Sequence, residues 1–177
     1  MIMNVKYLKI GVIISLFLAF PIFAQLNSTF PNIKLLDVNE KSAYTPNIGE
    51  KVLLIYYVDP DVYEIYTPIA NEVKKKKYQS KDFQNIAIMN LKDTWVPNFL
   101  IMSELKKSQK KDPVSKILID KNYSFAKALN ISIPDDSIEI IVVGKDSKIK
   151  FINFIKSEKD AKSISNKIIE AIDSALK

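Results

Sequence analysis

The chain of 177 residues contains no cysteine, no histidine and, among its 26 basic residues, no arginine. Without cysteine it has no disulfide, redox dithiol or thiolate nucleophile. Without histidine it also lacks the usual general base near neutral pH and a common metal ligand. Carboxylate, hydroxyl, amide, lysine and tyrosine chemistry remains. With 47% hydrophobic residues, a chain of this length buries a core large enough to fold without disulfides or metals.

The start of the chain has the pattern of a secretory signal peptide. Two lysines precede an apolar run at residues 10–20, and the small residue Ala24 suits a cleavage position. A membrane helix needs roughly 20 apolar residues, so this run is short for one, and an uncleaved anchor is the alternative. We therefore expect a signal peptide at residues 1–24 and one domain at residues 25–177. The protein would be periplasmic or secreted, without a stable membrane span after cleavage.

Strand and helix patterns alternate along the rest of the chain. The runs Val52–Val58 and Ile138–Val143 are continuously apolar, as in strands covered on both faces. Asp is a good helix N-cap and Pro is favoured at the first helical position, so Asp59 and Pro60 should open a helix that reaches about Tyr78. Further strands are expected at residues 33–38, 85–91, 116–120 and 148–152, and further helices at 99–111, 124–129 and after Ser157. This alternation predicts an α/β sandwich with a mixed sheet.

One segment, Tyr57–Val73, resembles the strand-to-helix segment of thioredoxin-fold proteins, in which a CxxC motif opens the helix and a proline bends it further on. Counting back from Pro68 places Pro60 and Tyr63 at the cysteine positions. A proline inside a helix costs about 3 kcal/mol unless the fold needs the bend, so Pro68 carries much of this resemblance. Residues 85–120, followed by the strand and turn at 140–149, resemble the peroxiredoxin and TlpA-like branch.

The chain is also similar to the YtfJ-like family, which comprises small exported bacterial proteins with a thioredoxin-like fold and no assigned activity. Residues 85–94, 103–113 and 116–122 carry this likeness, with Asp135–Ser137 before an Ile/Val strand. The resemblance implies a thioredoxin-like three-layer sandwich, with a central mixed β-sheet flanked by helices, and no cofactor. The thioredoxin cis-proline, expected near Ser137, is missing together with the thiols, which argues against redox chemistry of that kind.

In the implied fold, the turn after the Val52–Val58 strand and the loop before Ile138 form one edge. The candidate binding residues there are Asp59, Pro60, Asp61, Tyr63, Asp135, Asp136 and Ser137. Four converging carboxylates would suit a hard cation such as Ca²⁺. The alternative is that each aspartate has a local structural role: Asp59 caps the helix, Asp61 lies at the positive end of its dipole, and Asp135 and Asp136 begin a turn. This alternative is favoured because the chain has no EF-hand or similar spacing of ligands.

Aromatic residues divide into core and surface candidates. We expect Tyr56 or Tyr57 to be part of the core, and Phe99 and Met102 to face inward from their helix. Trp95 lies in a polar loop with a proline, and it is therefore the best candidate for an exposed contact at the same edge.

Three functions fit these features. The favoured one is a non-catalytic binding module of the bacterial cell envelope, whose partner is an unidentified envelope protein or small ligand. The alternative is a carboxylate- or metal-dependent enzyme with Asp59 or Asp61 as base and a metal or lysine as electrophile. A weaker third is polyanion binding by the lysines at 74–77 and 106–111. Solvated helix faces explain these lysines better, because arginine is absent and acids are interspersed, and nucleic acid is not an expected partner.

Purified protein should show no disulfide reductase and no thiol peroxidase activity, because both mechanisms need a thiolate and the chain has none. Insulin reduction followed by turbidity checks this, with a thioredoxin as positive control. Reduction of insulin by the purified chain would contradict this expectation.

Overall fold

The computed structural model of the protein describes residues 25–92 and 94–177, so the expected signal peptide at residues 1–24 lies outside the described residues. Its elements in chain order are β1 (Lys34–Asp37), β2 (Ser42–Tyr44), β3 (Val52–Val58), the 3₁₀ helix η1 (Pro60–Tyr66), α2 (Thr67–Lys76), β4 (Phe83–Asn90), α3 (Asn98–Lys111), β5 (Lys116–Asp120), α4 (Ser124–Leu129), β6 (Ile138–Val143), β7 (Ile149–Ile155) and α5 (Glu158–Ala175). Within these ranges, no helix is both long and apolar enough to cross a membrane.

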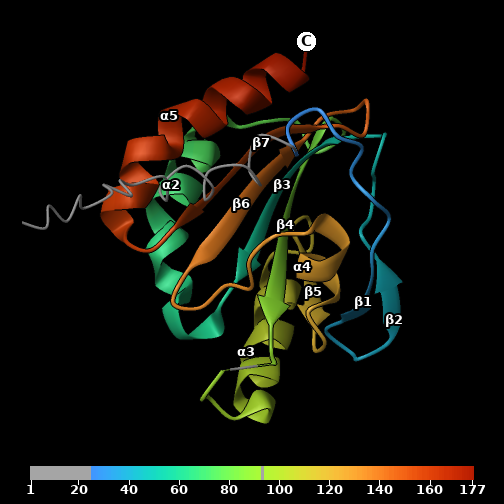
Figure 1. Cartoon of the computed structure of the whole chain (residues 1–177), viewed down its shortest axis with the longest axis vertical. Helices are drawn as coiled ribbons and strands as arrows, with labels where there is room; N and C mark the ends of the chain where they lie inside the picture. Colours follow the sequence, from blue (N-terminus) through green and yellow to red (C-terminus); the bar gives the residue numbers. More distant parts are fainter. Residues whose placement is uncertain (1–24, 93) are drawn as a thin grey trace, which may run out of the picture.

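The strands form one mixed sheet in the order β2-β1-β5-β4-β3-β6-β7. At its centre, β3 pairs with β4 in parallel and with β6 antiparallel. Helices α2 and α5 pack side by side on one face, and α4 lies on the other (Figure 1). The prediction of an α/β sandwich with a mixed sheet between helices is confirmed.

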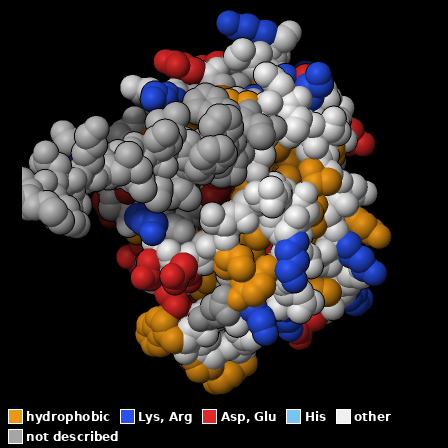
Figure 2. Space-filling view, viewed as in Figure 1, with side chains coloured by type: hydrophobic (Ala, Val, Ile, Leu, Met, Phe, Trp, Pro, Cys, Tyr) orange, Lys and Arg blue, Asp and Glu red, His pale blue; other side chains and the backbone are white. Residues whose placement is uncertain are grey.

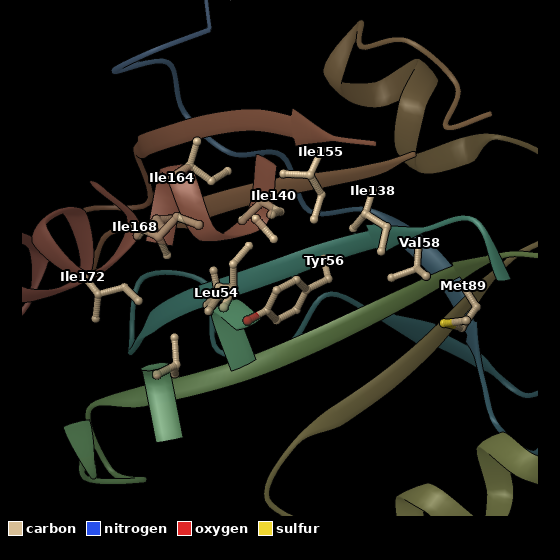
Figure 3. Packing of buried hydrophobic residues seen from close by; sticks show 14 of the residues in the cluster. Leu54, Tyr56, Val58, Met89, Ile138, Ile140, Ile155, Ile164, Ile168 and Ile172 are labelled. Atoms are coloured by element: carbon tan, nitrogen blue, oxygen red, sulfur yellow. The ribbon is translucent and has the colours of Figure 1, made fainter. Parts of the chain in front are cut away.

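Two apolar clusters, one on each face of the sheet, explain why β3 and β6 are continuously apolar: every residue of both strands is buried. On the α2 and α5 face, alternate residues of the strands meet the apolar stripe of α5. Figure 3 shows this packing, with Tyr56 of β3, Ile140 of β6 and Ile168 of α5 directed toward one another. On the opposite face, Tyr57 packs against Phe125 of α4.

The single helix predicted between Asp59 and Tyr78 is wrong. The chain forms η1 and then α2, and Val62 has non-helical angles (φ −127°, ψ 22°) within η1. Pro68 lies in the first turn of α2, where its missing N–H costs no intrahelical hydrogen bond. Pro68 therefore begins a new helix here and does not kink a continuous one.

Helix α3 begins one residue earlier than predicted, and its first turn is more exposed. Met102 is buried as expected, but Phe99 is 71% exposed, which corrects its predicted inward position. Met102 is the only fully buried residue of α3, while Ile101 and Leu105 pack against the core from partly buried positions. The helix begins at the lower end of the molecule (Figure 1). The first turn of α3 has little of the sheet beneath it, so Phe99 faces solvent.

Candidate functional site

The Asp59 carboxylate lies where β3 ends, and it connects two loops. Its Oδ1 accepts a hydrogen bond from the Asp61 backbone N–H (3.0 Å) and thereby caps η1. Its Oδ2 accepts a hydrogen bond from the Asp136 N–H (2.9 Å) in the loop before β6. The Asp59 N–H also donates to the Ser137 carbonyl oxygen at 3.4 Å. Asp59 thus holds the turn after β3 against the loop before β6.

Asp59 is 8% exposed, and this burial raises the pKa of its carboxyl. Hydrogen bonds from the N–H groups of Asp61 and Asp136 lower that pKa, whereas the negative charges of the same two residues raise it. The environment of this carboxylate therefore has an excess of negative charge. A positively charged group placed beside it would favour its ionised form.

The Asp61 side chain fastens a third loop to the same edge. Its Oδ1 accepts a hydrogen bond from the Thr94 hydroxyl at 2.6 Å, and its Oδ2 accepts one from the Trp95 N–H at 3.4 Å. The Thr94 oxygen in turn accepts a hydrogen bond from the Val96 N–H. Asp61 therefore orders the loop that presents Trp95, a contact that the sequence pattern did not indicate.

An acidic hollow of about 390 Å³ lies between these loops. Its lining residues are Asp59, Asp61, Asn90, Thr94, Ile133, Pro134, Asp135 and Asp136. The four predicted aspartates are thus brought together. Within the described residues, however, no group of three or more acidic side chains is placed to hold a metal ion. The oxygens of Asp59 and Asp61 instead accept hydrogen bonds from the protein.

The other predicted site residues lie around this hollow and differ in their availability. Pro60 and Ser137 are buried, and Ser137 lines the neighbouring pocket that contains Glu139 and not this hollow. Trp95 is 80% exposed and Tyr63 is 52% exposed. The Tyr63 hydroxyl donates to Glu64, and this hydrogen bond, the charge of Glu64 and partial burial raise the pKa of Tyr63.

Exposed apolar side chains extend this edge onto α3. The negative charge of Glu104 on α3 also raises the pKa of Tyr63. Phe99 and Leu100 in the first turn of α3 are exposed, like Trp95 just before them. Apolar side chains gather at the lower end of the molecule, next to acidic ones (Figure 2). We call Tyr63, Trp95, Phe99 and Leu100 the aromatic rim.

Four residues of the hollow were not among the predicted site residues: the polar Asn90 and Thr94, and the apolar Ile133 and Pro134. Asn90 ends β4, the parallel neighbour of β3, and its amide oxygen accepts a hydrogen bond from the Lys92 N–H. The carboxyl ends of neighbouring parallel strands meet at one edge of a sheet, so the polar residues after both strands were a usable signal.

A second carboxyl group missed by the sequence reasoning, that of Glu139, lies on the far side of the loop Ile133–Asp135. Glu139 is in β6, directly opposite Tyr57 of β3 and Phe154 of β7, and it is 8% exposed. Burial raises the pKa of its carboxyl to about 7. The signal was present in the sequence, because Glu139 is the only charged residue in an otherwise apolar strand.

Comparisons with known proteins place the chain in a family. Residues 47–174 match the model of the family described as "Bacterial protein of unknown function (YtfJ_HI0045)". No curated protein matches the chain.

Solved structures with thioredoxin-like names share the fold. The thioredoxin domain of a thiol-disulfide oxidoreductase from Bacteroides vulgatus has a TM-score of 0.53 at 15% identity, over 81% of this chain and 97% of that chain. A peroxiredoxin-like protein from Aquifex aeolicus has a TM-score of 0.57 at 13% identity, over 83% of this chain and 87% of that chain. A hypothetical protein from Sinorhizobium meliloti 1021 has a TM-score of 0.63 at 13% identity, over 85% of this chain and 84% of that chain. At identities of 13–15%, the likeness shows a shared fold and nothing about function.

The variant Glu139→Gln should become more stable, relative to the unchanged protein, as pH rises from about 4.5 to about 7. The pKa of the Glu139 carboxyl is raised from 4.5 to about 7 in the folded state, so folding favours its protonated form. The stability of the unchanged protein is therefore fully present below pH 4.5, and part of it is lost as pH rises through 7 and the buried carboxyl ionises. A neutral amide does not titrate. The expected difference in the free energy of unfolding reaches about 3 kcal/mol, since one pKa unit corresponds to about 1.4 kcal/mol.

Urea unfolding of both proteins across this pH range measures the difference. Glu170→Gln, a change of the same kind at an exposed position on α5, should follow the unchanged protein at every pH. Parallel stability curves for Glu139→Gln and the unchanged protein would show that Glu139 is not a buried, titrating carboxyl.

Proposed function

We propose a binding function, without catalysis, for this chain, which belongs to the family of bacterial proteins of unknown function denoted YtfJ_HI0045. The ligand of the candidate edge is an extended segment of a partner protein that carries both lysine or arginine and apolar side chains. The observation that carries this proposal is the acidic hollow beside the exposed aromatic rim.

The acidic hollow supports the basic part of this ligand. Four aspartates line it, and the buried Asp59 gains from a neighbouring positive charge. A lysine side chain that enters the hollow would bring its ammonium close to these carboxylates while its methylene stem contacts Ile133 and Pro134.

The aromatic rim supports the apolar part. Trp95, Phe99 and Tyr63 are more than half exposed although their rings have large apolar surfaces. Clustered exposed apolar side chains next to polar ones are typical of protein interaction sites, and tyrosine and tryptophan are enriched there. Their ring faces also attract cations, so the rim and the hollow favour the same ligand.

The absence of thiols supports a role without redox chemistry. The chain keeps the fold of neighbours named for peroxiredoxin and thiol-disulfide chemistry, but it has neither cysteine nor histidine. In the position of a redox motif it presents Asp59, Pro60, Asp61 and Tyr63, which cap and support loops.

The signal-peptide pattern supports a location in the cell envelope. We propose that residues 1–24 are removed on export and that the remaining chain acts in the periplasm or outside the cell. Its stability there would depend on packing alone, because the chain has no cysteine to form a disulfide.

Trp95 is the only tryptophan of the chain, so its fluorescence reports binding at the rim. A short peptide of alternating lysine and leucine should shift its emission to shorter wavelength in a saturable manner, because the ring loses water on binding. Added salt should weaken this binding, since the charges lie at the surface. A peptide of alternating glutamate and leucine should produce no shift.

The matched variants are Phe99→Ala in the rim and Tyr44→Ala on β2, an aromatic residue that is also more than half exposed (54%) and lies on the outermost strand of the sheet. Phe99→Ala should weaken peptide binding, and Tyr44→Ala should leave it unchanged. Both should change stability by less than about 0.5 kcal/mol, as is usual for exposed positions. Equal responses to the basic and acidic peptides, or equal effects of the two variants, would contradict the proposal.

A further inference from the structure

The buried carboxyl of Glu139 has no partner of its own. It accepts no hydrogen bond from the described residues and forms no ion pair with them, and its residue is 8% exposed. The neighbouring Tyr57 directs its hydroxyl to Asp120, with an oxygen–oxygen distance of 3.2 Å. Buried polar groups are nearly always hydrogen-bonded, so an unpartnered carboxyl at the wall of a cavity indicates a missing ligand.

Glu139 lines a pocket of about 340 Å³. The pocket lies on the far side of the loop Ile133–Asp135 from the acidic hollow, and this loop lines both. Apolar walls come from Ile131, Ile133 and Phe154. The volume and the apolar walls suit a small organic group with a short hydrocarbon body.

A second acceptor without a partner lines the same pocket. The Gln25 side-chain amide donates to the carbonyl oxygens of Leu129 (2.8 Å) and Asn130 (3.1 Å). These two bonds fix the amide, and its oxygen Oε1 is buried with no hydrogen bond from the described residues. The Gln25 oxygen is shielded from solvent, so Glu139 is the unpartnered acceptor that the pocket offers to a ligand with hydrogen-bond donors.

The charges around the pocket determine the sign of the ligand. Asp135 and Lys156 also line it, both at exposed positions, and they offset each other. Among the side chains that line the pocket, the ionised Glu139 then leaves one negative charge without compensation. A neutral donor would leave that charge buried, whereas a cation neutralises it.

We propose that this pocket binds a primary ammonium group on a short apolar body, with the ammonium against the Glu139 carboxylate. An ammonium has three N–H donors and no acceptor, so it suits a carboxylate without a partner. Its hydrocarbon body lies against Ile131, Ile133 and Phe154. The ammonium belongs either to a free alkylamine or to the amino terminus of a peptide.

Calorimetric titration of the purified protein at about pH 8 with n-butylammonium chloride tests the proposal, because Glu139 is ionised there. n-Butanol is the matched ligand without charge. The amine should bind at least about tenfold more tightly than the alcohol, as expected for a hydrogen-bonded ion pair in a buried site. Equal affinities would overturn the proposal.

Two variants locate the binding. Glu139→Gln keeps the shape and removes the charge, and it should weaken amine binding by at least about tenfold. The control Glu170→Gln, at an exposed position on α5, should leave the affinity unchanged. If Glu139→Gln binds the amine as the unchanged protein does, the ammonium site is elsewhere and the proposal is wrong.

A pH titration of the unchanged protein keeps the proposal testable if Glu139→Gln fails to fold. Amine affinity should rise as pH increases from about 5 to about 8, because Glu139 loses its proton over this range while the amine stays charged. A flat profile would overturn the proposal.

Leucinamide distinguishes the two sources of the ammonium group, since it represents the amino terminus of a peptide. Affinities are compared for the charged form of each amine, because an α-amine is only about half protonated at pH 8. Tighter binding of charged leucinamide than of n-butylammonium assigns the pocket to peptide termini, and the reverse assigns it to free amines. Trp95 lies outside this pocket, so its peptide response is independent of the calorimetric result.

Discussion

Two hydrogen bonds to one buried carboxylate hold the candidate edge together. Asp59 accepts one from Asp61 and one from Asp136, and thereby joins the turn after β3 to the loop before β6. Loss of an N-cap costs about 0.5–2 kcal/mol, and a hydrogen bond to a charged group, such as that from Asp136, contributes about 1.5–3 kcal/mol. Asp61 in turn fastens the Trp95 loop. The positions of the hollow and the aromatic rim therefore depend on Asp59.

This arrangement gives a thioredoxin-like scaffold an edge that carries carboxylates and no thiols. Asp59 caps η1 there, and Asp61 orders the Trp95 loop. The loop Ile133–Asp135 lines both the acidic hollow and the Glu139 pocket. Both cavities combine carboxylates with apolar side chains, and the ligands proposed for them therefore carry a positive charge on a hydrocarbon body.

The sequence predicted those parts of the fold in which burial alone decides which residue types are present. The strands Val52–Val58 and Ile138–Val143 were predicted at their observed bounds, since burial on both faces requires continuous apolar runs. The three-residue strand β2 was missed because it is short and mostly exposed, and so has no hydrophobic pattern. The break before Pro68 and the exposure of Phe99 depend on which tertiary neighbours are present, which local patterns do not contain. The contact between Asp61 and Thr94 joins residues far apart in the chain, and no spacing rule indicates it.

Amide hydrogen exchange of Asp59→Ala, compared with the unchanged protein, tests the central role of Asp59 most directly. In the unchanged protein the N–H groups of Asp61 and Asp136 should exchange slowly, because the Asp59 carboxylate accepts both. In Asp59→Ala both should exchange much faster, while amides in the paired strands β3 and β6 keep their protection. Unchanged protection of Asp61 and Asp136 in the variant would contradict the account.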